Sequence, residues 1–84
     1  MKWIPEDKIE DIKATTPVKV GEKIRHYRRI KDLTQTDLAS MVGNDRQYIY
    51  KIEKGKVSPS ISTIAVIACA LDISLAQLFE NIEL

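Results

Sequence analysis

The sequence predicts an all-α domain of five helices, and three observations support this: the capping residues, the apolar spacing and the breaks between helices. Five residues that favour helix N-termini stand before apolar residues at helical spacing: Thr16, Thr34, Asp45, Ser60 and Ser74. Eighty-four residues make one domain, near the lower limit of what a single core stabilises. A partner subunit would therefore be a reasonable supplement.

The first helix of the domain is expected to begin near Thr16 or Pro17, a cap followed by a favoured first residue. Its core-facing stripe has helical spacing and consists of Val20, Ile24, Tyr27 and Ile30. We therefore divide the chain into an N-terminal extension, residues 1–16, and a domain, residues 17–84.

The extension carries an apolar series on a predicted short helix that begins near Pro5. This series consists of Trp3, Ile4, Ile9 and Ile12. It is expected to pack over the last two helices of the domain. A DNA minor-groove arm is the alternative, but such arms are rich in Arg and Lys, whereas this segment is slightly acidic.

Two short helices joined by a tight turn occupy residues 33–57. Thr34 and Asp37 have the spacing of a capping box, and Gly43 interrupts the first helix. Asp45 caps the second helix, and Gly55 ends it. Residues 45–53 thus form a separate, short second helix.

The second helix of this pair begins with polar and basic side chains that have no evident buried role. Arg reads guanine and Gln reads adenine through paired hydrogen bonds in the major groove of DNA. We therefore interpret residues 45–53 as a recognition helix. Arg46, Gln47 and Lys51 are the candidates for contacts with bases.

Charge is distributed unevenly along the chain, although the net charge is only +1. Residues 18–58 hold ten basic and five acidic side chains, whereas residues 59–84 hold three acidic side chains and no Lys or Arg. The basic excess coincides with the candidate recognition helix and can neutralise phosphates. The acidic end is expected to face away from DNA.

Between residues 20 and 80 the sequence resembles the phage repressor and Cro family of helix-turn-helix proteins (XRE-like transcriptional regulators). The shared residues are Leu33, Thr34, Gln35, Leu38, Ala39, Gly43, Ile49, Ile52, Glu53, Gly55, Pro59, Ser60, Leu71, Ile73 and Ser74. The resemblance implies a compact, lambda-repressor-like DNA-binding domain that acts as a transcriptional regulator or repressor. The chain departs from the family pattern at Asp32, where Gly is common, and at Lys54, where Asn is common.

The resemblance also assigns roles to single residues. It implies a structural pair between Arg28 and Glu53, and a contact between Gln35 and a phosphate at the start of its helix. Lys54 and Lys56 follow the recognition helix and are further candidates for phosphate contacts. For Tyr48 and Tyr50, a hydroxyl contact with phosphate, a contact with a thymine methyl group and partial packing in the core all remain open.

The fourth predicted helix carries more apolar surface than one core needs, because residues 64–71 include no charged side chain. Ile61, Ile64, Ala68 and Leu71 are expected to face the other helices. A second surface must then cover the remaining apolar residues. We therefore predict a homodimer whose interface includes Val66, Cys69, Leu75, Phe79 and Ile82.

Other functional classes lack support in the sequence. One cysteine forms no internal disulfide, and no cluster suggests a metal, a cofactor or a catalytic site. No membrane span or signal peptide is recognisable, so a cytoplasmic location is expected. Two alternatives remain: an antitoxin that binds a protein partner and represses its own operon, or a controller of a restriction-modification system. The controllers have a similar start to the recognition helix, Asp45, Arg46, Tyr48 and Ile49.

Overall fold

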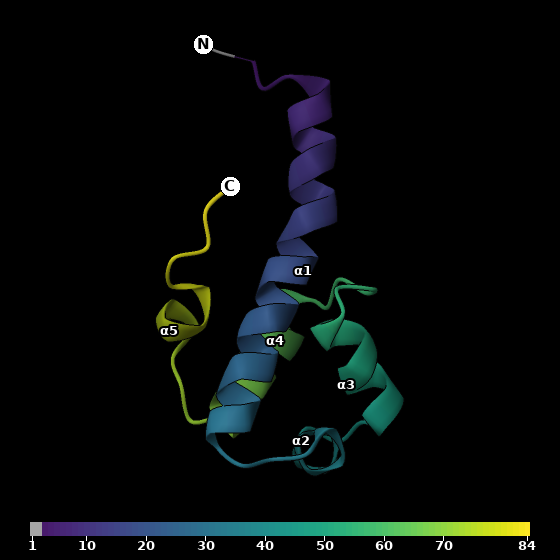
Figure 1. The fold of residues 1–84 in the computed structure, drawn as a ribbon, viewed down its shortest axis with the longest axis vertical. Coiled ribbons are helices and arrows are strands. Elements are labelled where there is room, and N and C mark those ends of the chain that lie inside the picture. The colour runs from purple at the N-terminus through teal and green to yellow at the C-terminus, as the bar shows by residue number, and fades with distance from the viewer. Residues whose placement is uncertain (1–2) are drawn as a thin grey trace.

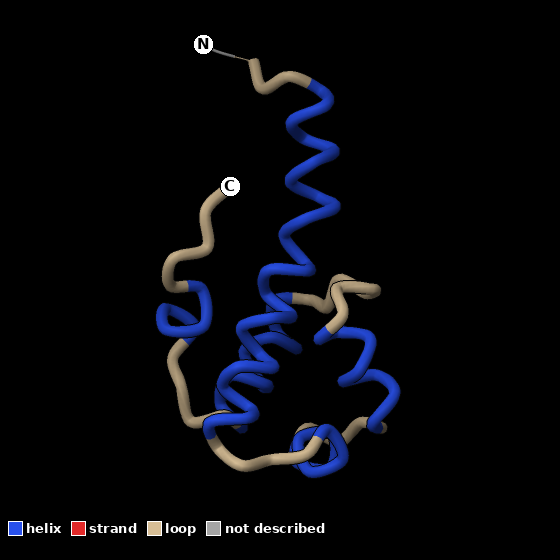
Figure 2. The backbone as a smooth tube through the Cα atoms, in the orientation of Figure 1, coloured by secondary structure: helices blue, strands red, loops and turns tan. Residues whose placement is uncertain are grey.

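The computed structural model describes residues 3–84, and these residues contain five helices and no strand. The helices are α1 (Glu6–Ile30), α2 (Gln35–Met41), α3 (Arg46–Glu53), α4 (Ile61–Ala70) and α5 (Leu75–Phe79). In Figure 1, α1 is the long axis of the molecule, and α3 and α5 lie on opposite sides of it. Short loops connect α2, α3, α4 and α5 (Figure 2).

The predicted caps of the last four helices are confirmed. Thr34 accepts a hydrogen bond from the Asp37 backbone, and the Asp37 carboxylate accepts one from the Thr34 backbone. The Asp45 side chain caps α3 and the Ser60 side chain caps α4. Ser74 and Gln77 form a second capping box at α5. These bonds satisfy backbone N–H groups that a helix leaves free in its first turn.

The predicted break before Pro17 is wrong, because α1 runs without interruption from Glu6 to Ile30. An interior proline removes one helical hydrogen bond and destabilises a helix by about 3 kcal/mol. Pro17 is half-buried, and its neighbour Val18 lies close to Gly55, so tertiary contacts hold this part of the helix. The extension is therefore a continuation of α1.

The extension also does not form the predicted lid over α4 and α5. Trp3 is 86% exposed and Ile4 is 59% exposed, while Ile9 is only partly covered. Figure 1 shows the N-terminal half of α1 extending beyond the other helices. The other helices lie beside the C-terminal half of α1, so few groups are available to cover its N-terminal half.

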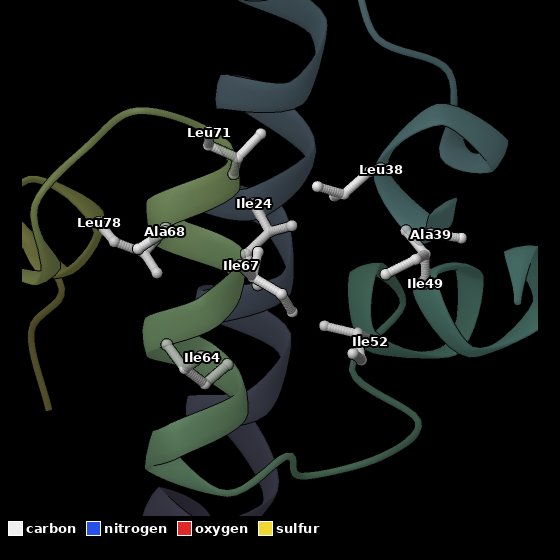
Figure 3. Close-up of a cluster of buried hydrophobic side chains, with 10 residues drawn as sticks. All are labelled: Ile24, Leu38, Ala39, Ile49, Ile52, Ile64, Ile67, Ala68, Leu71 and Leu78. Atoms are coloured by element: carbon white, nitrogen blue, oxygen red, sulfur yellow. The ribbon is translucent and has the colours of Figure 1, made fainter. Parts of the chain in front are cut away.

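The core lies where α4 meets α1, α2, α3 and α5 (Figure 3). It consists of Ile24, Leu38, Ala39, Ile49, Ile52, Ile64, Ile67, Ala68, Leu71 and Leu78. Two sequence predictions of core positions are wrong. Ile30 is 62% exposed because α1 ends there, and Ile61 is 65% exposed because it occupies the first turn of α4, beyond the packed part of that helix.

Gly21 lets α1 approach the end of α3 at very short range. A Cβ atom at this position would lie 2.3 Å from the Ile52 carbonyl oxygen and 2.8 Å from that of Glu53. Only glycine fits such a backbone contact. The contact fixes the C-terminal end of α3 against the long helix, which makes α1 the frame on which α3 is mounted.

Candidate nucleic-acid interface

The outer face of α3 presents the three predicted base-reading side chains to solvent. Arg46, Gln47 and Lys51 are exposed, whereas Ile49 and Ile52 on the opposite face are completely buried. This division follows from the helical period, because residues three apart lie on the same side of a helix. The polar side chains of α3 are therefore available for contacts, and its apolar side chains attach it to the core.

A buried ion pair joins α1 to the end of α3. Arg28 Nε donates to Glu53 Oε2 over 2.6 Å, and a terminal nitrogen donates to Glu53 Oε1 over 2.9 Å. The other terminal nitrogen of Arg28 donates to the Leu33 carbonyl over 2.7 Å. The hydrogen bond to Glu53 raises the pKa of Arg28, against the opposing effect of desolvation. Such paired hydrogen bonds set orientation as well as distance, so α3 has a defined direction relative to α1.

Gln35, a predicted phosphate contact, joins this network from the first residue of α2. Its amide nitrogen donates to Glu53 Oε1 over 3.2 Å, and its side chain is half-buried. An amide nitrogen carries two hydrogens, so this bond leaves one donor for a further partner. The carboxylate of Glu53 thus binds side chains of both α1 and α2.

A positively charged groove of about 630 Å³ lies between the C-terminal part of α1, the start of α2 and α3. We call it the cationic groove. Five of its lining side chains are cationic and two are acidic: Arg25, Arg28, Arg29, Arg46 and Lys54 against Asp32 and Glu53. Because Glu53 is already paired with Arg28, most of the remaining charge is positive. Such an excess attracts phosphate groups.

Sequence reasoning did not single out Arg25 and Arg29. They are four residues apart on α1 and both line the cationic groove. Their helical spacing places them on one face, which was a usable signal. The sequence did not reveal that this face of α1 borders α3.

The two tyrosines of α3 have different surroundings, and both are half-buried. Tyr48 packs against the hydrophobic core, whereas Tyr50 lines the cationic groove. The ammonium groups of Lys54 and Lys56 lie 6.0 and 5.4 Å from the centre of the Tyr50 ring. These cation–aromatic contacts hold both lysines near the end of α3.

The five predicted dimer residues do not line one common pocket. Val66 is 51% exposed on α4, and Cys69 and Leu75 line a shallow depression between α4 and α5. Phe79 and Ile82 line a different, apolar groove beside α1. The chain therefore has two uncovered apolar surfaces.

Two other findings concern chemistry and membranes. Within the described part of the chain, no three His, Cys, Asp or Glu side chains gather in a way that could hold a metal ion. None of the helices described here combines the length and apolar character that crossing a membrane requires.

Comparisons with known proteins agree with this geometry. The helix-turn-helix family HTH_3 matches residues 24–78. The chain is 40% identical over 57 residues to an uncharacterized HTH-type transcriptional regulator of Methanocaldococcus jannaschii, covering 68% of this chain and 86% of the relative. It is 36% identical over 67 residues to the control protein C.MunI of Mycoplasma sp, covering 79% of this chain and 90% of the relative.

Among solved structures, the chain is similar to the restriction-modification controller protein C.AhdI from Aeromonas hydrophila. The TM-score is 0.76 and the sequence identity 39%, with 82% of this chain and 99% of that chain covered. The all-α arrangement described above is thus the lambda-repressor-like fold. The chain belongs to the HTH_3 family of helix-turn-helix DNA-binding transcriptional regulators, which are not enzymes.

Proposed function

We propose that this regulator binds an inverted-repeat site in double-stranded DNA as a homodimer, with α3 in the major groove. The observation that carries the proposal is the exposed set of Arg46, Gln47 and Lys51 on a helix that a buried ion pair fixes in direction. A fixed helix with free polar groups can present the same donors to every base pair, as direct readout requires. In a dimer, two such helices reach two half-sites.

Phosphate contacts in this proposal come from both sides of α3. Arg25 and Arg29 line the cationic groove on one side, together with the free amide hydrogen of Gln35. Lys54 and Lys56 act at the end of α3, where the Tyr50 ring holds their ammonium groups. Tyr48 is a further candidate through its hydroxyl group. Phosphate contacts orient a protein on DNA, while base contacts select the sequence.

The dimer contact in this proposal is formed by the exposed face of α4, with Val66 and Cys69, and by the neighbouring Leu75. An apolar side chain that is half exposed in the monomer gains stability when a second copy covers it. A two-fold contact of this kind places the same patch of both subunits together. Residues 59–84 are acidic and hold no Lys or Arg, so this end of the chain is unsuited to DNA.

The finer proposal is that the chain is a controller of a restriction-modification system. It is supported by the similarity to two control proteins, C.MunI and C.AhdI. The antitoxin alternative has no comparable support among these relatives. Isolation of the chain from its own cells distinguishes the two, because an antitoxin copurifies with a second polypeptide in stoichiometric amount.

Selection of bound duplexes from a random pool tests the proposal. At a stated salt concentration, we expect two related half-sites in inverted orientation, with centres about 10 base pairs or a multiple apart. For a controller, matching sequences stand upstream of restriction and modification genes. Recovery of no preferred sequence by folded protein would contradict sequence-specific binding.

A further inference from the structure

Tyr50 lies on α3 between a basic side chain about one turn before it and another about one turn after it. Arg46 and Lys54 are each four residues away, so the three side chains follow one line along the helix. All three line the cationic groove. Tyr50 is therefore an aromatic side chain in the middle of a positively charged surface.

The hydrophobic core does not account for the position of Tyr50. Among the described residues, the partly buried side chains that pack against the core include Tyr48 but not Tyr50. The contacts of the Tyr50 ring are instead with cations, because the ammonium groups of Lys54 and Lys56 lie 6.0 and 5.4 Å from its centre. Of the roles that the sequence left open for this tyrosine, packing in the core is thus the least supported.

The turn after α3 brings Lys56 back toward the helix. Gly55 has a φ of 70°, and the Lys56 amide donates to the Lys51 carbonyl over 2.9 Å, as in a common glycine-ended helix terminus. A Cβ atom on Gly55 would lie 2.7 Å from the Cα of Val18, so α1 fixes the position of this turn. The side chain of Lys56 therefore starts from a fixed backbone and ends at the Tyr50 ring.

The two ammonium groups beside the ring keep their capacity to bind an anion. Within residues 3–84, both salt bridges involve other side chains: Arg28 with Glu53, and Lys31 with Asp72. An aromatic face attracts a cation but does not neutralise it, and an ammonium group has three N–H donors. Two like charges beside one ring also repel each other, and a bound anion relieves this repulsion.

A ring that already confines a lysine lowers the cost of binding through that lysine. A free lysine side chain has many rotamers, and it loses most of this freedom when its ammonium group is fixed on a phosphate. Lys54 and Lys56 are exposed on their outer sides, and the Tyr50 ring is the contact that limits their movement. Part of the entropy is therefore lost before DNA binds.

We propose that Tyr50 is a positioning residue for DNA binding: its ring holds Lys54 and Lys56 where each binds a backbone phosphate. This inference rests on the proposed function and deepens it, because it assigns a role to the ring of Tyr50 and none to its hydroxyl group. Phosphates carry no sequence information, so the ring strengthens binding to all duplexes alike.

Binding titrations with the selected duplex at several salt concentrations test the proposal. Tyr50→Leu removes the ring, and we expect affinity to fall about tenfold, since two lysines must then be ordered on binding. The salt slope should stay unchanged, because both lysine charges remain. Removing the charges with Lys54→Ala and Lys56→Ala should instead reduce the salt slope by about two. Tyr50→Phe keeps the ring and should keep the affinity of the unchanged chain.

A double-mutant cycle shows whether the ring acts through the lysines. In a chain with Lys54→Ala and Lys56→Ala, Tyr50→Leu should have little further effect. Lys51→Ala is the matched control, because Lys51 is exposed on the same helix without a contact to the ring, and the tenfold effect of Tyr50→Leu should persist there. Equal effects of Tyr50→Leu in the two backgrounds would overturn the proposal. Circular dichroism establishes folding, and Tyr50→Met replaces Tyr50→Leu if the latter does not fold.

Nuclear magnetic resonance of the free protein gives a readout that needs no DNA. The side-chain protons of Lys54 and Lys56 should be displaced upfield of those of Lys51 by the ring, and Tyr50→Leu should abolish this displacement. Its absence from the unchanged chain would overturn the inference even where DNA binds as proposed. A folded chain that shows the displacement but binds no duplex would refute the proposed function instead.

Two further outcomes of the binding titrations would also contradict the role of the ring. If Tyr50→Phe binds as weakly as Tyr50→Leu, the hydroxyl group of Tyr50 makes the contact. If the loss in Tyr50→Leu is confined to duplexes with thymine at one position, the side chain reads a methyl group. A uniform loss that Tyr50→Phe does not show is the result that supports positioning.

Discussion

The two ends of α1 differ in how their side chains are covered and paired. At its C-terminal end, the charged side chain of Arg28 is buried and makes three hydrogen bonds, while the surrounding surface is polar and exposed. At and just before its N-terminal end, the apolar side chains of Trp3, Ile4 and Ile9 are exposed to solvent. The first end has its buried charges paired within one chain, whereas the second leaves apolar side chains in contact with water. The difference teaches that a buried charge requires partners from other helices, while an exposed apolar side chain is tolerated where no other helix reaches it.

Of all the substitutions that test this comparison, removal of the Glu53 side chain should cause the largest loss of stability. Glu53→Ala leaves Arg28 buried without its partner, and loss of one partner of a buried ion pair costs about 3–5 kcal/mol of the free energy of unfolding. Denaturant titration measures this change. The control is Asp72→Asn at the exposed pair with Lys31, whose atoms are 3.8 Å apart. Exposed pairs contribute about 0–1 kcal/mol.

A double variant keeps this prediction testable if Glu53→Ala fails to fold. Arg28→Met with Glu53→Leu replaces both charges by apolar groups of similar size, and such replacements are often neutral or stabilising. We expect a folded protein in which α3 has lost the hydrogen bonds that set its direction, with weakened DNA selectivity. A Glu53→Ala chain as stable as Asp72→Asn would show that the pair does not anchor α3.

Gly21→Ala should destabilise the same end through backbone contact. The new Cβ would lie 2.3 Å from the Ile52 carbonyl oxygen, so α1 and α3 must move apart. Overpacking of this kind costs about 1–3 kcal/mol, and we expect the upper part of that range. Gly43→Ala is the control, because no atom lies within 4 Å of its Cβ position and only its positive φ of 71° opposes the change. Equal losses in the two variants would mean that the close approach of α1 to α3 has no special cost.

The sequence predicted contacts between neighbouring residues better than contacts between distant segments, and the reason is physical. The caps at Thr34, Asp45, Ser60 and Ser74 were predictable because each bond joins residues about three positions apart. Contacts between distant segments were not. The role of Gly21 depends on where α3 crosses α1, and a glycine in a helical stripe does not report that crossing.

The N-terminal half was mispredicted for a related reason. Pro17 follows Thr16 in the pattern of a helix start, and a local rule cannot tell a start from an interior proline that tertiary contacts tolerate. The sequence also could not show how far the cationic groove extends along α1. Arg25 and Arg29 were visible as charges, but their position beside α3 follows only from the packing of α1.

Base and phosphate contacts at the recognition end should respond differently to substitution. Arg46→Ala should lose about 1–3 kcal/mol of discrimination at one base position, with other positions unchanged. Arg29→Gln and Lys56→Ala should each weaken binding to all duplexes alike and reduce the salt slope by about one. Binding titrations at several salt concentrations separate these effects.

Lys23→Gln is the control for the phosphate variants, because Lys23 lies on α1 outside the cationic groove. We expect a smaller change in its salt slope than for Arg29→Gln. If Arg29→Gln and Lys23→Gln behave alike, the cationic groove is not a phosphate site. If Arg46→Ala and Lys56→Ala both leave binding untouched, the contacts assigned to α3 are wrong.

Asp32 offers a stabilising change at the C-terminal end of α1. Its φ is 58°, a left-handed conformation that favours glycine, and the Asp32 and Leu33 amides donate to the Arg29 and Arg28 carbonyls. Asp32→Gly should therefore raise the free energy of unfolding by about 0.5–1 kcal/mol, as measured by denaturant titration. The lost acidic group also borders the cationic groove, so DNA affinity should rise slightly. Lower stability would show that the Asp32 side chain contributes more than its strained backbone costs.

The smallest effect is expected from Asp37, whose carboxylate is fully exposed in the capping box of α2. Hydrogen bonds from the Thr34 backbone and then the Thr34 side chain lower the pKa of Asp37. A lowered folded-state pKa means that the stabilisation is fully present above the unfolded value, near pH 4, and is lost as pH falls through the folded value. The stability difference between the unchanged chain and Asp37→Asn should thus be constant above about pH 5 and narrow below pH 4. Thermal unfolding across this pH range measures it. A stability difference that widened on acidification would mean that the capping box stabilises the protonated form of Asp37. The direction of the pKa shift given above would then be wrong.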